Sequence, residues 1–343
     1  MKAAEILSNP NWIPISLTSQ KTVLFQEFQP GGITNSVFLD NRARGKTDAT
    51  ARLKINDIVS YARMQKETSV LRQLFHISHV GSTLIANVLQ SVPESIVYRE
   101  PTIFRALAQT IDAIRSNSSE YQAKEYPTLY SSILKLFCRG SEKFKAIKQT
   151  SGNLILPPES QIDSVLSHDA YLYTNAKDFL SHAINSQGLL SDAVSSGPVR
   201  MTYYNRLCSA NQLSFATLKP LEKVALVWMT EMQKILARTS TNFHNKAINF
   251  DEEIRNGGIG NITSKLVNIF GISEFEKELL ESKSWCENSK SKEAFSLEER
   301  IKTIDKNYLS NKIEIQKAIE FIRTQSSENI NFYPLQQFLG DNA

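Results

Sequence analysis

The chain is poor in cysteine, with only three among 343 residues: Cys138, Cys208 and Cys286. They form no C-x-x-C pair, and no histidine stands near them at metal-ligand spacing. The sequence therefore gives no indication of a zinc site or of a disulfide framework. We expect all three to be buried free thiols.

The sequence also lacks a long apolar run and a block of charge of one sign. No run approaches the length of a membrane helix, and the first ten residues lack the apolar core of a secretory signal. The formal net charge of +4 is spread along the chain rather than gathered into a basic arm. We therefore expect a cytoplasmic protein that binds neither a membrane nor a nucleic acid.

What the sequence does contain is a regular alternation of strand and helix patterns. With 41% hydrophobic and 22% charged residues, the chain has the composition of a folded protein and enough length for a full core. Five apolar strand candidates are separated by helical patterns, which predicts an α/β fold: a mostly parallel sheet with helices on both faces. The predicted strands are 73–78, 95–99, 145–149, 170–174 and 246–250.

The flanks of this alternation differ from its centre. Residues 1–65, with one strand-like run at Val23–Phe28, are expected to be an N-terminal extension packed on the core. Residues 66–275 should form the α/β domain. Residues 276–343 are rich in Lys and Glu at first, and we expect a helical C-terminal segment there. In the helix expected at 218–237, Trp228 is interpreted as a core residue rather than a cofactor contact.

The most informative segment runs from Phe75 to Leu89 and reads as a strand, a glycine turn and the start of a helix. Free N–H groups and the positive end of the helix dipole make such a turn an anion site. Hydroxyls at Ser82 and Thr83 add hydrogen-bonding groups. A Cβ at Gly81 would intrude where a phosphate lies, so Gly81→Val should abolish anion binding in a folded protein.

The segment is not a Walker A loop, because that motif needs Gly at the position of His76 and Lys at that of Ser82. A nucleotide-dependent phosphotransferase is thereby disfavoured, although it stays an alternative. An ordinary strand-to-helix connection is the other alternative for this turn.

The segment resembles the 5′-phosphosulfate loop of sulfotransferases, in which a basic residue and a small residue precede Gly-Ser-Thr or Gly-Thr-Thr and an apolar helix. The matching residues are His79, Val80, Gly81, Ser82, Thr83 and Leu84. After the helix, Pro93, the strand at 96–98 and Glu100 also follow the family pattern. The Lys-Gly-x-x-Gly motif near the end of cytosolic sulfotransferases is absent, which favours the bacterial and tyrosylprotein-like branches. The resemblance implies a P-loop-like sulfotransferase fold.

The same resemblance implies roles for particular residues. Glu100 would be the catalytic base, or alternatively only a helix N-cap ahead of Pro101. His79 stands where the family has Lys or Arg facing the leaving group, and it would serve if protonated. Lys148 resembles the family's Lys-x-x-Ser strand end, with a surface lysine as the alternative.

A second clamp of the family, which grips the 3′-phosphate, corresponds to the segment 174–182. Lys177 and Ser181 are the candidate binding residues there. Two departures stand out: Thr174 replaces the phosphate-binding Arg, and His182 occupies the family's Ser position, one residue after Ser181. A helix capped by Asn175 is the alternative interpretation.

The sequence thus predicts transfer of a sulfuryl group from 3′-phosphoadenosine 5′-phosphosulfate to a hydroxyl of a small-molecule or carbohydrate acceptor, without a metal ion. A non-catalytic nucleotide-binding module on the same fold is the third candidate. The acceptor itself and the oligomeric state are left open, since acceptor pockets are built from variable loops such as 186–211.

Overall fold

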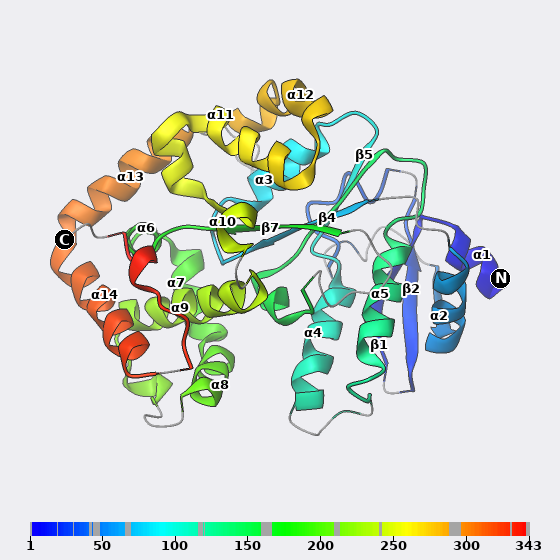
Figure 1. The fold of residues 1–343 in the computed structure, drawn as a ribbon, viewed down its shortest axis with the longest axis horizontal. Coiled ribbons are helices and arrows are strands. Elements are labelled where there is room, and N and C mark those ends of the chain that lie inside the picture. The colour runs from blue at the N-terminus through cyan, green and yellow to red at the C-terminus, as the bar shows by residue number, and fades with distance from the viewer. Residues whose placement is uncertain are drawn as a thin grey trace.

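The computed structural model shows a parallel sheet between two layers of helices (Figure 1). It describes residues 2–340 except 19, 30, 41–42, 44–48, 66–69, 116–118, 120, 159–166, 209–212, 240–241, 288–295 and 330. The predicted boundary at residue 66 and the end of the loop 186–211 therefore lie outside the described residues.

The central sheet has five strands in the order β5-β6-β4-β7-β8, and every neighbouring pair is parallel. All but β7 are short and wholly or almost wholly buried, as expected for strands covered on both faces. Their bounds are β4 Leu71–His76, β5 Ser95–Arg99, β6 Phe144–Lys148, β7 Ser167–Tyr173 and β8 Ala247–Asn249.

Helices cover both faces of this sheet, and Figure 1 shows α3, α11 and α12 on one side with α4, α5 and α9 on the other. These helices are α3 Ser82–Gln90, α4 Thr102–Arg115, α5 Tyr126–Leu136, α9 Pro220–Thr239, α11 Phe250–Phe270 and α12 Glu276–Leu280. Trp228 on α9 is fully buried and donates from Nε1 to the Thr174 carbonyl at 2.8 Å. Its prediction as a core residue is confirmed.

Further helices, the C-terminal pair among them, lie toward one end of the molecule, and α10, Phe243–Lys246, lies beside the central sheet (Figure 1). The helices toward that end are α6 Ala176–Ala183, α7 Gln187–Ser195, α8 Gly197–Leu207, α13 Leu297–Ser310 and α14 Lys312–Ser327. The described residues also include short 3-10 turns: η2 Ser151–Ile155, η4 Phe215–Thr217, η6 Ser273–Phe275, η7 Lys283–Cys286 and η8 Gln336–Phe338. No helix among the described residues is long and apolar enough to cross a membrane.

The N-terminal residues form a second sheet at the opposite end of the molecule (Figure 1). It is antiparallel in the order β1-β2-β3, with β1 Trp12–Leu17, β2 Thr22–Glu27 and β3 Thr50–Lys54; α1 Ala3–Ser8 precedes it and α2 Ile55–Met64 follows. Thr102 Oγ1 donates to the Ile15 carbonyl at 2.7 Å, and buried Arg139 donates to the Leu7 carbonyl at 2.9 Å. These bonds join the first residues to α4 and to the end of α5.

The predicted α/β class and all five central strands are confirmed, each within three residues of its expected bounds. In the N-terminal region only the strand at 23–28 was expected, and β1 and β3 were missed. The expectation of three buried cysteines is wrong for Cys286, which is exposed, and Cys138 is only partly buried.

Candidate functional site

The loop between β4 and α3 has the shape expected of an anion site. Gly81 lies in the left-handed region at φ 79° and is the N-cap of α3, with no side chain capping the helix. The N–H groups of the first turn, from Ser82 to Leu84, therefore keep the donor capacity that a cap would use. His79 is also left-handed, at φ 59°, a conformation that costs energy in a residue with a Cβ.

The need for glycine at position 81 has a different cause from the one expected. A Cβ there would lie 2.7 Å from the Phe250 ring on α11, rather than in the space for an anion. Gly81→Val would therefore displace the start of α11 or the loop itself. The expectation that this variant loses anion binding in an undisturbed fold is withdrawn.

A pocket of about 430 Å³ opens in front of this loop, at the carboxyl ends of the central strands. His79, Gly81, Ser82, Thr83 and Glu100, five of the residues predicted from sequence, line it. The remaining lining residues are Phe38, His76, Ser78, Arg105, Lys148, Thr150, Ser151, His182, Asp192 and Arg300.

Glu100 and Lys148 form an ion pair inside this pocket. Lys148 ends β6 with its side chain only 2% exposed, so the surface-lysine alternative is wrong. Glu100 follows β5 at φ 54°, its N–H donates to the Lys148 carbonyl at 2.8 Å, and its side chain is 16% exposed. The carboxylate is directed at the lysine and stays within reach of a bound molecule.

A second, fully buried carboxylate holds the loop from behind. Glu231 on α9 accepts from the Ser78 N–H at 2.7 Å and from its hydroxyl at 3.0 Å. Arg200 on α8 donates to Glu231 at 2.6 Å and to Asp192 at 3.2 Å. The Arg200 charge and the Ser78 N–H bond keep the pKa of Glu231 below its ordinary value against the opposing effect of burial. These contacts fix the loop to α7, α8 and α9.

Histidine and arginine side chains complete the pocket. Arg300 on α13 makes a two-pronged ion pair with buried Asp251, at 2.7 and 3.2 Å. Burial, and then the charge of Arg300, lower the pKa of His182 to about 4, so this imidazole is neutral at pH 7. Burial and the Lys148 ammonium likewise lower the pKa of His76 to about 4.

The structure does not bring Lys177 and Ser181 into this pocket. Ser181 is buried, and its hydroxyl donates to the Lys177 carbonyl at 2.6 Å within α6. The Lys177 ammonium lies 5.3 Å from the centre of the Tyr308 ring. The next residue, His182, lines the pocket instead, because a step of one residue turns a side chain by about 100° around a helix. Geometry gives no support to Lys177 and Ser181 as a phosphate clamp.

Val80 and Leu84, also predicted as binding residues, do not line the pocket, and their side chains are buried in the core. Asn175 does cap α6, accepting from the Asp178 N–H at 2.8 Å, as its alternative interpretation required.

Sequence reasoning missed Arg105 and Arg300. Arg105 lies six residues after a predicted strand end on a helix face, a spacing that could have indicated it. Arg300 stands in a Lys- and Glu-rich segment with no local signal, and only the packing of α13 brings it to the pocket.

The lining side chains include more cations than carboxylates, although Lys148 is paired with Glu100 and Arg300 with Asp251 behind the lining. Three permanent cations, Arg105, Lys148 and Arg300, face two carboxylates, Glu100 and Asp192. Such a set favours an anion and offers a carboxylate base beside it. Among the described residues, no group of three or more His, Cys, Asp or Glu side chains is placed to hold a metal ion.

Comparison with known proteins finds no matching family model and no matching curated protein. Among solved structures, the sulfotransferase domain from the curacin biosynthetic pathway is 14% identical, covering 77% of this chain and 99% of its own, with a TM-score of 0.36. The sulfotransferase domain from the Synechococcus PCC 7002 olefin synthase is 12% identical, covering 76% and 96%, with a TM-score of 0.33. Similarity at this level does not assign this chain to a family.

Proposed function

We propose that the chain transfers a sulfuryl group from 3′-phosphoadenosine 5′-phosphosulfate to a hydroxyl of a small-molecule or carbohydrate acceptor. The observation that carries this proposal is the Glu100–Lys148 pair, with a buried lysine and a partly exposed glutamate, in one pocket with the N-terminus of α3. A base, a cation and an anion cradle are the parts that such a transfer needs.

Each part has a role in the proposed reaction. The donor, when bound, supplies an activated sulfuryl group whose bond to a phosphate oxygen breaks. Glu100 accepts the proton of the acceptor hydroxyl, whose oxygen forms the new bond to sulfur. Lys148, His79 when protonated, and the first N–H groups of α3 offset the negative charge that collects on the leaving phosphate.

The backbone of the site is strained at two of the residues that the proposal uses. Among the described residues, four with side chains have a left-handed φ, and His79 and Glu100 are two of them. Strain of this kind persists where surrounding contacts hold a functional side chain in place. The Glu231 carboxylate on Ser78 and the N–H bond of Glu100 to Lys148 are such contacts.

The two alternatives are a nucleotide-dependent phosphotransferase and a binding module without catalysis. The loop has Ser82 where a phosphotransferase P-loop has its lysine. The binding module is favoured by one observation: buried Thr174 in place of an arginine leaves the expected 3′-phosphate clamp without its cation.

Thermal melting with two ligands separates these functions. Adenosine 3′,5′-bisphosphate in excess chelator should raise Tm, since a ligand that binds only the folded state stabilises it. A Tm shift that occurs only with ATP and Mg²⁺ would replace the proposal by the phosphotransferase.

Turnover is the second measurement. With ³⁵S-labelled donor, the chain should release label to a panel of phenols, alcohols and sugars faster than buffer does. If the chain binds the bisphosphate but transfers label to water and to every acceptor no faster than buffer does, the non-catalytic binding module is the better assignment.

A further inference from the structure

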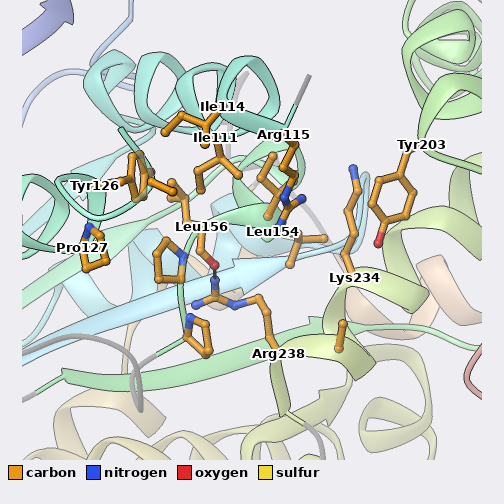
Figure 2. A pocket seen from close by; sticks show the side chains of 15 residues that line it. Ile111, Ile114, Arg115, Tyr126, Pro127, Leu154, Leu156, Tyr203, Lys234 and Arg238 are labelled. Atoms are coloured by element: carbon orange, nitrogen blue, oxygen red, sulfur yellow. Dashed lines mark hydrogen bonds between the residues drawn. The ribbon is translucent and has the colours of Figure 1, made fainter. Parts of the chain in front are cut away.

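A second pocket, of about 420 Å³, lies on the sheet face covered by α4 and α9 (Figure 2). Its volume is in the range of small-molecule sites. It is lined by Ile111, Ile114, Arg115, Ala123, Tyr126, Pro127, Leu154, Ile155, Leu156, Pro157, Pro158, Tyr203, Lys234, Ala237 and Arg238. None of these residues lines the pocket in front of the anion loop.

Charged and apolar side chains occupy different parts of this pocket. Figure 2 shows Arg115, Lys234 and Tyr203 at one end, with Ile114, Tyr126 and Pro127 toward the other. The Lys234 ammonium lies 4.5 Å from the centre of the Tyr203 ring. A molecule that fills the pocket would therefore meet cations at one end and apolar surface at the other.

The floor of the pocket is a rigid ion pair. Arg238 donates to Asp169 at 3.0 Å and to the Tyr171 hydroxyl at 3.1 Å, and its guanidinium lies over the Phe75 ring. Its charge is already matched by buried Asp169, so it shapes the pocket without demanding an anion.

Lys234 and Arg115 differ from Arg238 in this respect. Across the described part of the chain, neither forms a salt bridge or a hydrogen bond with another residue. The nearest acid on α9, Glu231, is engaged by Arg200 and Ser78. Lys234 is partly buried and Arg115 is exposed. The charges of Glu231 and Asp112 act on Lys234 from beyond contact distance, and Asp112 is itself paired with Arg206 at 3.4 Å. With no carboxylate in contact with either cation, this end of the partly apolar pocket leaves a place for an external anion.

We infer that this pocket binds a hydrophobic monoanion, an aryl or alkyl carboxylate, with its charged group between Lys234 and Arg115. The guanidinium fork suits a carboxylate, and the ring of Tyr203 holds the lysine in place. The apolar end then buries the body of the molecule. This inference does not depend on the proposed function.

Calorimetric titration with 4-phenylbutyrate at pH 7 tests it, and 4-phenylbutan-1-ol serves as the uncharged analogue. The acid should saturate one site, and the alcohol should bind about tenfold or more weakly. Lys234→Gln should reduce affinity for the acid to near that of the alcohol. Equal affinities for acid and alcohol, or no saturable binding of the acid, would overturn the inference.

Lys223→Gln is the matched control. Lys223 also lies on α9 and over an aromatic ring, that of Phe215 at 5.0 Å, but it is outside the pocket. Its loss should leave both affinities unchanged. Affinity for the acid that falls equally in the two variants would show that only the overall charge matters.

Reductive methylation tests the same inference on the original chain, so the result does not depend on whether a variant folds. Bound 4-phenylbutyrate should slow methylation of Lys234 relative to Lys223, as read by peptide mass spectrometry. A ratio of the two rates that is the same with and without saturating acid would contradict the proposed position of the anion.

Discussion

Strands β5 and β6 lie side by side in the sheet, and a Glu–Lys pair lies at each end of them. Before the strands, Glu94 accepts from the Lys143 ammonium at 2.7 Å, and its carbonyl accepts from the Lys143 N–H. After the strands, Glu100 is paired with Lys148, and here the Glu N–H donates to the lysine carbonyl. Both glutamates are left-handed, at φ 52° and 54°.

The two pairs differ in surroundings. The side chains of Lys143 and Glu94 are 68% and 57% exposed, whereas those of Lys148 and Glu100 are 2% and 16% exposed. Water screens the first pair, and a pair of this kind contributes little. The second faces a helix N-terminus and other cations, where a carboxylate can act on a bound molecule. Position at the carboxyl edge, rather than the pair itself, makes one of them a candidate site.

The largest expected effect is on turnover. Glu100→Gln keeps the shape of the side chain and removes its basicity, so transfer should fall by about a hundredfold or more. The variant should still bind adenosine 3′,5′-bisphosphate, as measured by the rise in Tm that the ligand causes. Glu94→Gln makes the same change at the other end and should leave turnover unchanged. Transfer by Glu100→Gln near the unmodified rate would make Glu100 structural.

The next effect is on stability. Lys148→Met leaves a mostly buried carboxylate without its partner and should lower the free energy of unfolding by about 3 kcal/mol. Lys143→Met removes an exposed partner and should cost less than about 1 kcal/mol. Urea unfolding of the two variants measures both. Equal losses would mean that burial does not distinguish the pairs.

The two ends should also respond differently to acid. His76 and His182, both in the pocket, have pKa values lowered from 6.5 to about 4, by burial first and then by Lys148 and Arg300 respectively. At a pH between about 4 and 6.5, these histidines are therefore protonated in the unfolded chain and neutral in the folded chain. The free energy of unfolding that depends on these two histidines is therefore greatest above about pH 6.5 and decreases as the pH falls toward 4.

Hydrogen exchange at pH 7 and pH 5 follows this difference residue by residue. Amides of the loop 77–83 should lose protection at pH 5, while those around Glu94 and Lys143 should not. His182→Asn should reduce the dependence of unfolding on pH in this range. A uniform loss of protection across the sheet would indicate a global cause instead.

The sequence was sufficient for the sheet because each central strand is a short apolar run between helical patterns. The same alternation placed His79 and Glu100 after strands, and parallel strands bring such positions to one edge. The N-terminal sheet was harder to see. β3, Thr50–Lys54, has only one buried residue, so its pattern carries little apolar signal.

The rest of the site depends on tertiary packing. The family resemblance singled out Lys148 with a surface lysine as the alternative, and only the coverage of β6 on both faces shows that it is buried. Arg300 lies at the pocket because it pairs with Asp251, which is 49 residues away in the sequence. The family pattern places His182 at its Ser position, and the phase of α6 directs His182 rather than Ser181 into the pocket.

The smallest expected effect concerns the backbone, in which the two ends are alike. A left-handed φ costs about 1 kcal/mol or more in a residue with a Cβ and almost nothing in glycine. Glu94→Gly should therefore be more stable than Glu94→Ala by about 1 kcal/mol, and Glu100→Gly should exceed Glu100→Ala by a similar amount. Both variants at a position lack the ion pair, so the difference between their free energies of unfolding reports the backbone strain alone. Urea unfolding of the four variants measures these differences. A much larger difference at position 100 would show that the pocket adds strain beyond the shared turn, whereas equal differences leave burial as the feature that separates the two pairs.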